Sequence, residues 1–334
     1  MSGGAFSDQE GRTHDRLIAG DDFDGQLARF RADGWSVDQI YPADEPHTAI
    51  LSRSDDRVRL SSRVDFEEPG VKLPDFHPGF VLTRAADDGG AGRAGMLYRD
   101  LIPGRLGGRY IASHITITKG GPVDDWVHYH SVALQMICVR SGWVRVVYED
   151  QGDPFVMQAG DLVLQPPYIR HRVLESSPGL EVIEVGCPSV HKTYGDHAMV
   201  LPHGTDPDRL FSGQRFLRHR AAGTGWTPWG GGEAQETDMA RATAGLANVR
   251  TVRPTGSAPI RFPAHDGELV FGFVVAGSAR LEAAKPHDLG SGDAFVIPPA
   301  EQWAIMGATS DFRLLHVTSA LMPAQIPEAR VESA

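Results

Sequence analysis

Two histidines separated by one residue, His128 and His130, are the most distinctive chemical feature of this sequence, and His171 follows after several turn-rich segments. Residues i and i+2 of a β-strand point to the same side of a sheet, so a strand through His128 and His130 presents both imidazoles to one face. Three neutral imidazoles would leave positions on a divalent metal open for a substrate and for O2 or water. A histidine pair on a strand is often an ordinary core or surface feature. The spacing of the surrounding residues therefore has to distinguish a metal site from such a pair.

That spacing is distinctive. Residues 121–135 contain the His-x-His pair, and the motif around His171 begins with Gly160-Asp161 and continues through Pro166-Pro167. The arrangement resembles the two motifs of the cupin superfamily, in which the first supplies His-x-His followed by Glu and the second supplies another His. The resemblance implies a jelly-roll barrel (double-stranded β-helix) that holds one divalent metal. It also implies that His128, His130 and His171 are the metal ligands.

Gln135 departs from the family pattern, because cupins usually have Glu at this position. An amide in place of a carboxylate leaves the metal its full charge, which favours an anionic substrate that binds through two oxygens. Gln135 either ligates the metal through its amide oxygen or orients the substrate by hydrogen bonds, and the sequence leaves both readings open. Three-histidine cupins that lack this Glu include dioxygenases of gentisate-like aromatics and β-diketones, and thiol dioxygenases. The resemblance therefore implies an Fe(II) dioxygenase that uses O2 on a small, chelating, oxygen-rich substrate.

Two other functions fit the same residues. A non-redox isomerase, lyase or hydrolase would use Zn(II), Ni(II) or Mn(II) as a Lewis acid, since ligand type discriminates poorly among these metals. A cupin sensor would only bind a small molecule, and a DNA-binding helix-turn-helix, which would favour that reading, is not recognisable in the sequence.

Three further side chains are candidates for the substrate pocket. His114 lies on the strand that leads into the metal motif, where it would face either the cavity or the outside of the barrel. Trp126 and Tyr168 flank the histidine motifs, where loops should meet the barrel mouth and shape an apolar or aromatic pocket. Ordinary packing is the alternative for each of them.

The spacing of the metal motifs in the first half of the chain recurs in the second half. Gln135 precedes Gly142 by seven positions, as Val270 precedes Gly277. The Gly-Asp and Pro-Pro pairs also recur at identical offsets, as Gly292-Asp293 and Pro298-Pro299. Two copies of one unit explain this better than coincidence.

The second copy lacks the ligands of the first. The positions equivalent to His128, His130, Gln135 and His171 are Pro263, His265, Val270 and Trp303. One histidine cannot hold a metal, so we expect a degenerate barrel filled by side chains and about one metal per chain.

The elements that must position these residues are short strands separated by turns, which predicts an all-β protein of two barrels with a small α/β N-terminal extension. A helix is expected from Asp22 to Asp33, followed by strands at 35–41, 47–52 and 57–61 in a segment that resembles part of a glyoxalase-type module. We divide the chain into a disordered arm (1–20), the extension (21–92), a metal-binding barrel (93–187), a linker packing on the barrels (188–245), a degenerate barrel (246–322) and a tail (323–334).

Composition limits the partners. A net charge of -11 without any Lys/Arg-rich tract gives no footprint for nucleic acid or an anionic membrane. No apolar run approaches the ~20 residues of a membrane span, and the start of the chain lacks a signal-peptide core, so a cytoplasmic protein is expected. Cys138 and Cys187 should stay reduced. Because cupin barrels commonly bury strand edges and sheet faces by association, we expect a homodimer.

Overall fold

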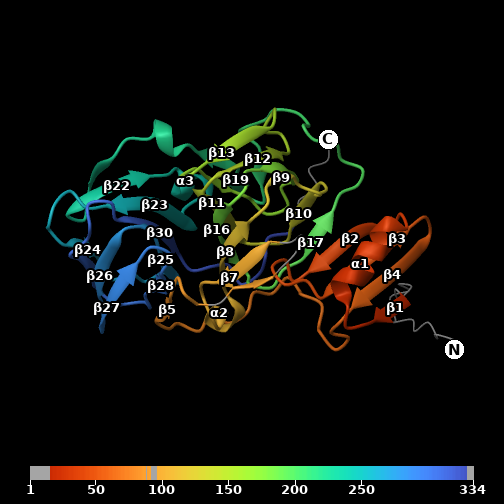
Figure 1. Cartoon of the computed structure of the whole chain (residues 1–334), viewed down its shortest axis with the longest axis horizontal. Helices are drawn as coiled ribbons and strands as arrows, with labels where there is room; N and C mark the ends of the chain where they lie inside the picture. The colour runs from red at the N-terminus through yellow and green to blue at the C-terminus, as the bar shows by residue number, and fades with distance from the viewer. Residues whose placement is uncertain (1–15, 88, 92–95, 329–334) are drawn as a thin grey trace.

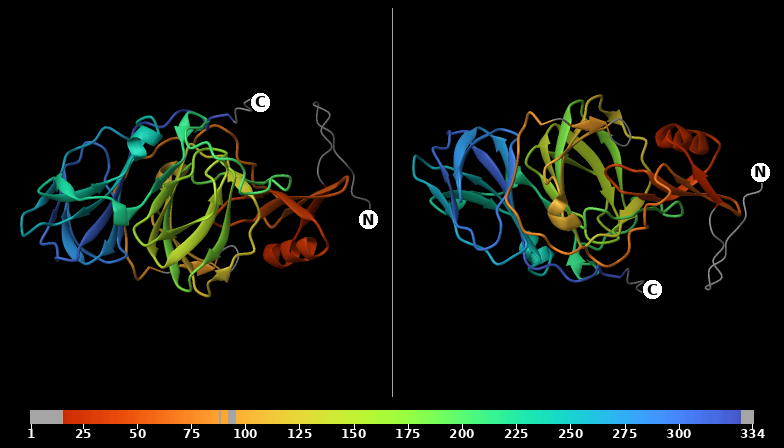
Figure 2. Two further views of the ribbon diagram at one scale, coloured as in Figure 1. Left: turned by 90° about the horizontal axis from the view of Figure 1, so that it is seen from above. Right: turned by 90° about the horizontal axis from the view of Figure 1, so that it is seen from below.

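The computed structural model describes residues 16–87, 89–91 and 96–328. Two β-barrels lie side by side along the molecule, with a small α/β module beyond the first barrel (Figure 1, Figure 2). The expected all-β class with an α/β extension is confirmed. None of the helices in the described ranges has both the length and the apolar character needed to cross a bilayer.

The N-terminal module packs one helix on a small sheet. Its elements are β1 (Arg16–Ala19), α1 (Phe23–Ala32), β2 (Ser36–Tyr41), β3 (Thr48–Arg53) and β4 (Asp56–Ser61). Asp22 caps α1 as expected, since its Oδ1 accepts a hydrogen bond from Gly25 N at 3.0 Å. Residues 16–19 were assigned to a disordered arm and instead form β1, which runs parallel to β4 and packs Ile18 on the module core. Residues 1–15 of that arm lie outside the described residues.

The first barrel consists of two facing sheets. One has the order β1-β4-β3-β2-β17-β10-β15-β12-β13 with β9 paired to β15, and the other has the order β20-β14-β11-β16-β8-β7-β6, where β17 is Thr193–Gly195 and β20 is Leu217–His219. Its strands are β6 (Gly90–Ala91), β7 (Leu97–Asp100), β8 (Ile111–Ile117), β9 (Gly121–Pro122), β10 (His128–His130), β11 (Leu134–Ser141), β12 (Trp143–Tyr148), β13 (Phe155–Gln158), β14 (Leu162–Leu164), β15 (His171–Ser176) and β16 (Leu180–Cys187), with the short helix α2 (Arg105–Gly108) before β8. Because β2 pairs with β17 and β17 with β10, the sheet of the N-terminal module continues into the sheet that carries all three histidines.

The second barrel repeats the first. Its strands are β23 (Ala247–Arg253), β24 (Ile260–Phe262), β25 (Leu269–Ala276), β26 (Ser278–Glu282), β27 (Pro286–Gly290), β28 (Ala294–Val296), β29 (Trp303–Met306) and β30 (Arg313–Ser319). Register irregularities occur at equivalent places, between Val139 and Ser141 in β11 and between Val274 and Ala276 in β25. Each is followed by a glycine with positive φ, 78° at Gly142 and 73° at Gly277. The repeat counted in the sequence is therefore present in the backbone.

The segment predicted as a linker, 188–245, is built into the sheets instead. It contains β17 (Thr193–Gly195), β18 (Leu210–Phe211), β19 (Gln214–Arg215), β20 (Leu217–His219), η2 (Ala221–Gly223), β21 (Thr227–Trp229), β22 (Gly232–Glu236) and α3 (Met239–Ala242). Strand β20 extends the first barrel through β14, and β22 extends the second through β23. The predicted extension 21–92 also overreaches, because β5 (Val81–Thr83) pairs with β28 of the second barrel. Strands this short carry too few residues to show an alternating pattern.

The barrels share a core. Outward-facing side chains of the first barrel, including Met136 and Ile183, form one buried cluster with side chains of the second, including Phe271 and Val317. At its border the Arg109 guanidinium makes two 2.8 Å contacts with the Glu268 carboxylate, which also accepts from the Tyr110 hydroxyl at 3.1 Å. The two sheets thus cover each other's apolar faces.

Candidate metal centre

Three buried imidazoles meet inside the first barrel. Strand β10 carries His128 and His130, and β15 starts with His171, which is paired directly with His128 across the antiparallel ladder. One ring nitrogen from each lies within 4.8 Å of the others. Within the described ranges, these are the only histidine, cysteine or carboxylate side chains that gather in a group of three or more at that spacing. The structure therefore brings together the three residues that the sequence singled out.

Each ring is oriented through its Nδ1 atom. The Nδ1 of His128 lies 2.8 Å from Trp126 O, and that of His171 lies 3.0 Å from Ile169 O. A backbone carbonyl can only accept, so both rings carry hydrogen on Nδ1 and keep the Nε2 lone pair. The Nδ1 of His130 lies 2.9 Å from the Thr193 hydroxyl. Oxygen partners of this kind fix the tautomer and ring orientation that a metal-binding histidine needs.

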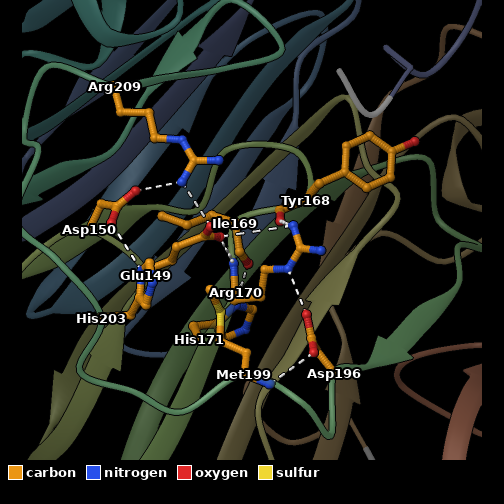
Figure 3. A network of polar contacts seen from close by, with 10 residues as sticks. All are labelled: Glu149, Asp150, Tyr168, Ile169, Arg170, His171, Asp196, Met199, His203 and Arg209. Atoms are coloured by element: carbon orange, nitrogen blue, oxygen red, sulfur yellow. Dashed lines mark hydrogen bonds and ion pairs between the residues drawn. The ribbon is translucent and has the colours of Figure 1, made fainter. Parts of the chain in front are cut away.

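A polar network outside the barrel holds the turn that leads into His171 (Figure 3). Arg170 N donates to Glu149 Oε2 at 3.1 Å, and the Arg170 side chain binds Asp196 Oδ2 at 3.1 Å. Arg209 contacts the other oxygen of the nearly buried Glu149 at 2.8 Å. The carboxylate thus ties the backbone next to the third histidine to a distant loop.

Gln135 faces the same cavity, and its amide has a defined orientation. Its Nε2 donates to Glu184 Oε1 at 2.7 Å, so the amide oxygen points elsewhere. That Oε1 atom is buried and has no hydrogen-bond partner. A buried acceptor without a donor is costly unless a cation or a donor group of a ligand satisfies it. This orphaned oxygen, together with three oriented imidazoles, fits a divalent metal with a bound substrate.

Glu184 was not among the sequence candidates, although its carboxylate lines the same cavity and accepts from the Gln135 amide. The signal was available, because period 2 along β16 places Leu180, Val182 and Glu184 on the inner face, and all three line the cavity. An acidic residue at an inward position of an apolar strand is a functional candidate.

The cavity has a volume of about 460 Å³ and a mostly aliphatic lining. Of the predicted pocket residues, Trp126 lines it and the other two do not. His114 points outward from β8, where its Nε2 lies 2.8 Å from Glu181 Oε2 and its ring 5.9 Å from that of Phe273 in the second barrel; burial lowers its pKa. Tyr168 points away from His171 and packs on the shared core (Figure 3). Both assignments are therefore corrected.

His191 lines the cavity and comes from the segment that was predicted as a linker. Its ring is 5.4 Å from that of His130, and its Nδ1 lies 3.1 Å from Pro188 O. Nε2 is buried without a hydrogen-bond partner, and burial lowers the pKa of the ring. His191 is thus a neutral side chain whose Nε2 can accept a hydrogen bond from a ligand.

The equivalent space in the second barrel is filled by rings. Trp303, at the position of His171, stacks on Phe262 with centroids 3.5 Å apart and meets Phe295 edge-on at 5.3 Å. His265 Nε2 binds Ile297 O at 3.1 Å. These aromatic side chains occupy the place that the metal group takes in the first barrel.

No protein-family model matches the chain, and no curated protein matches it in sequence. Among solved structures, salicylate 1,2-dioxygenase from Pseudaminobacter salicylatoxidans matches with a TM-score of 0.54 and 17% identity over 74% of this chain and 86% of that one. Oxalate decarboxylase from Bacillus subtilis matches with a TM-score of 0.52 and 12% identity over 77% and 78% of the two chains. Protein Ylba from E. coli gives 0.52 and 11% over 75% and 93%. At such identities the likeness establishes the fold alone, a bicupin-type arrangement of two barrels that an internal repeat relates.

Proposed function

We propose that this bicupin is a mononuclear metal-dependent dioxygenase in which His128, His130 and His171 hold one Fe(II) ion. The observation that carries the proposal is the set of three buried, Nδ1-anchored imidazoles beside the orphaned Gln135 oxygen. Such a metal would supply positive charge for chelating substrate oxygens and the redox chemistry that O2 requires. A salicylate 1,2-dioxygenase among the structures of this fold is in keeping with the proposal.

The chain's own residues orient the substrate and exclude water. Glu184 fixes the amide of Gln135, so that Oε1 either ligates the ion or accepts a hydrogen bond from the substrate. His191 Nε2 offers a second acceptor in the same cavity. Two unsatisfied acceptors favour a substrate that carries a hydroxyl or an enol beside its chelating oxygens.

A non-redox reaction at a Mn(II), Zn(II) or Ni(II) site is the second candidate. The Glu184 carboxylate inside the cavity favours it, because a lyase or isomerase needs a group that holds a proton near the substrate. Oxalate decarboxylases share the fold.

Measurements of metal content and O2 uptake distinguish the dioxygenase from the non-redox enzyme. The full-length chain would be purified without oxygen, loaded in turn with Fe(II), Mn(II), Zn(II) and Ni(II), and assayed for O2 uptake against catechols, hydroxybenzoates, β-diketones and thiols. We expect uptake with Fe(II) alone and about one metal per chain. Turnover without O2, under a redox-inactive metal, would move the assignment to the lyase class. Ligand capture without any turnover would indicate a sensor. Light scattering on the same samples tests the proposed homodimer.

A further inference from the structure

The cavity of the first barrel changes character along its length, as the strand registers show. At one level His171 lies opposite Tyr148, and Gln135 lies opposite Gly186. This is the polar end, with the metal group. Two residues further along β12 and β15, Val146 lies opposite Val173, and on the facing sheet Ile137 lies opposite Glu184.

Beyond Glu184 the side chains of the barrel strands that line the cavity are apolar, apart from Tyr98 of β7, which lies opposite Ile115. Val182 lies opposite Ile115 and Leu180 opposite Ile117, while Val144 lies opposite Met157. Tyr148 and Val144 are four residues apart on one strand, so the apolar end lies about 13 Å from the polar end at about 3.3 Å per residue.

The exposure of these side chains shows that the space is not closed by packing. Ile117, Ile137, Val173 and Val182 face into the barrel and line the cavity, yet they are only partly buried. The interior of the second barrel is instead packed by a buried hydrophobic cluster that includes Phe262, Leu281 and Phe295. An aliphatic surface left accessible inside a barrel lowers stability unless a ligand covers it.

The N-terminal module contributes to the same enclosure. Leu27 and Ala28 of α1 and Ile40 of β2 line the cavity. Arg31 closes this side by pairing with Asp124 at 2.9 Å and by lying over the Trp126 ring at 5.0 Å. The module therefore adds further apolar wall, together with the carboxylates of Asp24 and Asp44, which also line the cavity.

We propose that the substrate of this site has an apolar hydrocarbon body attached to its chelating oxygen head, with the head at the histidines and the body against the aliphatic strands. The inference rests on the proposed function for the head and on the cavity lining for the body. A small dianion without a body, such as oxalate, would leave most of the 460 Å³ and its aliphatic wall unused.

Binding of a homologous series tests the body directly. The full-length chain, loaded with redox-inactive Zn(II), is titrated calorimetrically with straight-chain α-keto acids from pyruvate to the eight-carbon member, and with oxalate. We expect Kd to fall about fourfold per added methylene, which corresponds to about 0.8 kcal/mol per buried CH2, with oxalate among the weakest ligands. Equal affinity along the series, or tightest binding of oxalate, would overturn the proposal.

Substitutions in the cavity wall test whether the dependence of affinity on chain length arises at the apolar end. Val182→Phe should fill the apolar end and abolish the gain in affinity for the longer acids. Val156→Phe is the matched control, because Val156 is 37% exposed on the outside of β13, and it should keep the full chain-length dependence. If Val182→Phe does not fold, Val173→Ile makes a smaller change of the same sign.

The dioxygenase assignment and the apolar substrate body can be refuted independently of each other. If the chain holds no metal, the dioxygenase assignment falls, and the metal-free chain is titrated with the same acids. If Kd of the metal-free chain does not change with the length of the acid, the proposal of an apolar substrate body is wrong. If Kd still falls about fourfold per methylene, the proposal holds independently of the metal.

Discussion

The hydroxyl of Thr193 is a clean point at which to perturb the metal group. It is buried and lies 2.9 Å from Nδ1 of His130. Nδ1 of His128 and Nδ1 of His171 each lie against a backbone carbonyl, which no substitution can remove, and Nδ1 of His128 also lies 3.4 Å from Asp125 Oδ1. Thr193→Val keeps the side-chain shape and deletes the acceptor. Loss of a partner of this kind typically reduces metal affinity 10–100-fold, which is about 1.4–2.7 kcal/mol. We expect the variant to bind Zn(II) or Fe(II) more weakly within this range.

The assay is a competition titration against a chelator of known affinity, with urea unfolding of the metal-free protein run in parallel. Thr193→Ser keeps the hydroxyl and is the matched control, so its metal affinity should stay within about threefold of wild type, well short of the loss expected on removing the partner. If Val and Ser variants bind metal as tightly as wild type while stability is unchanged, Thr193 does not support a ligand, and the reasoning about Nδ1 anchoring is wrong.

Three further outcomes are expected. Replacing His128 and His130 together by Ala should abolish the single equivalent of metal measured by elemental analysis, and metal retained by this variant would exclude the centre. Glu268→Gln breaks the buried pair with Arg109 and should lower the free energy of unfolding in urea by about 3–5 kcal/mol; a loss under about 1 kcal/mol would contradict the assigned role of the pair. Burial lowers the pKa of His316 from 6.5 to about 3, so the unfolded chain takes up this proton first. Stability should therefore fall as pH drops below 6.5, by up to about 1.4 kcal/mol per pH unit, and His316→Gln should flatten that slope in acid denaturation.

Strand periodicity carried most of the successful sequence analysis. The strands expected at 35–41, 47–52 and 57–61 are present as β2, β3 and β4, with each bound within one residue of the expected one. His128 and His130 share a face because that follows from period 2 alone. His114 was ambiguous for a physical reason, since both faces of β8 are covered, one by the cavity and the other by the second barrel.

Contacts between distant segments could not be predicted. Thr193 and His191 reach the metal group because β17 pairs with β10, and a three-residue strand leaves no pattern in the sequence. Ile40 and Leu27 line the cavity for the same reason, since β2 joins β17. Glu184 was predictable in principle, because it stands at an inward position of a recognised strand.

The shared core between the barrels has a consequence for how the chain comes apart. Each barrel buries an outer apolar sheet against the other, and the Arg109 guanidinium of the first pairs with the Glu268 carboxylate of the second. A barrel expressed alone would present that sheet to water and associate with other copies. The ring-filled second barrel is therefore a folding partner of the first, and the pair should denature as one cooperative unit despite containing two recognisable domains.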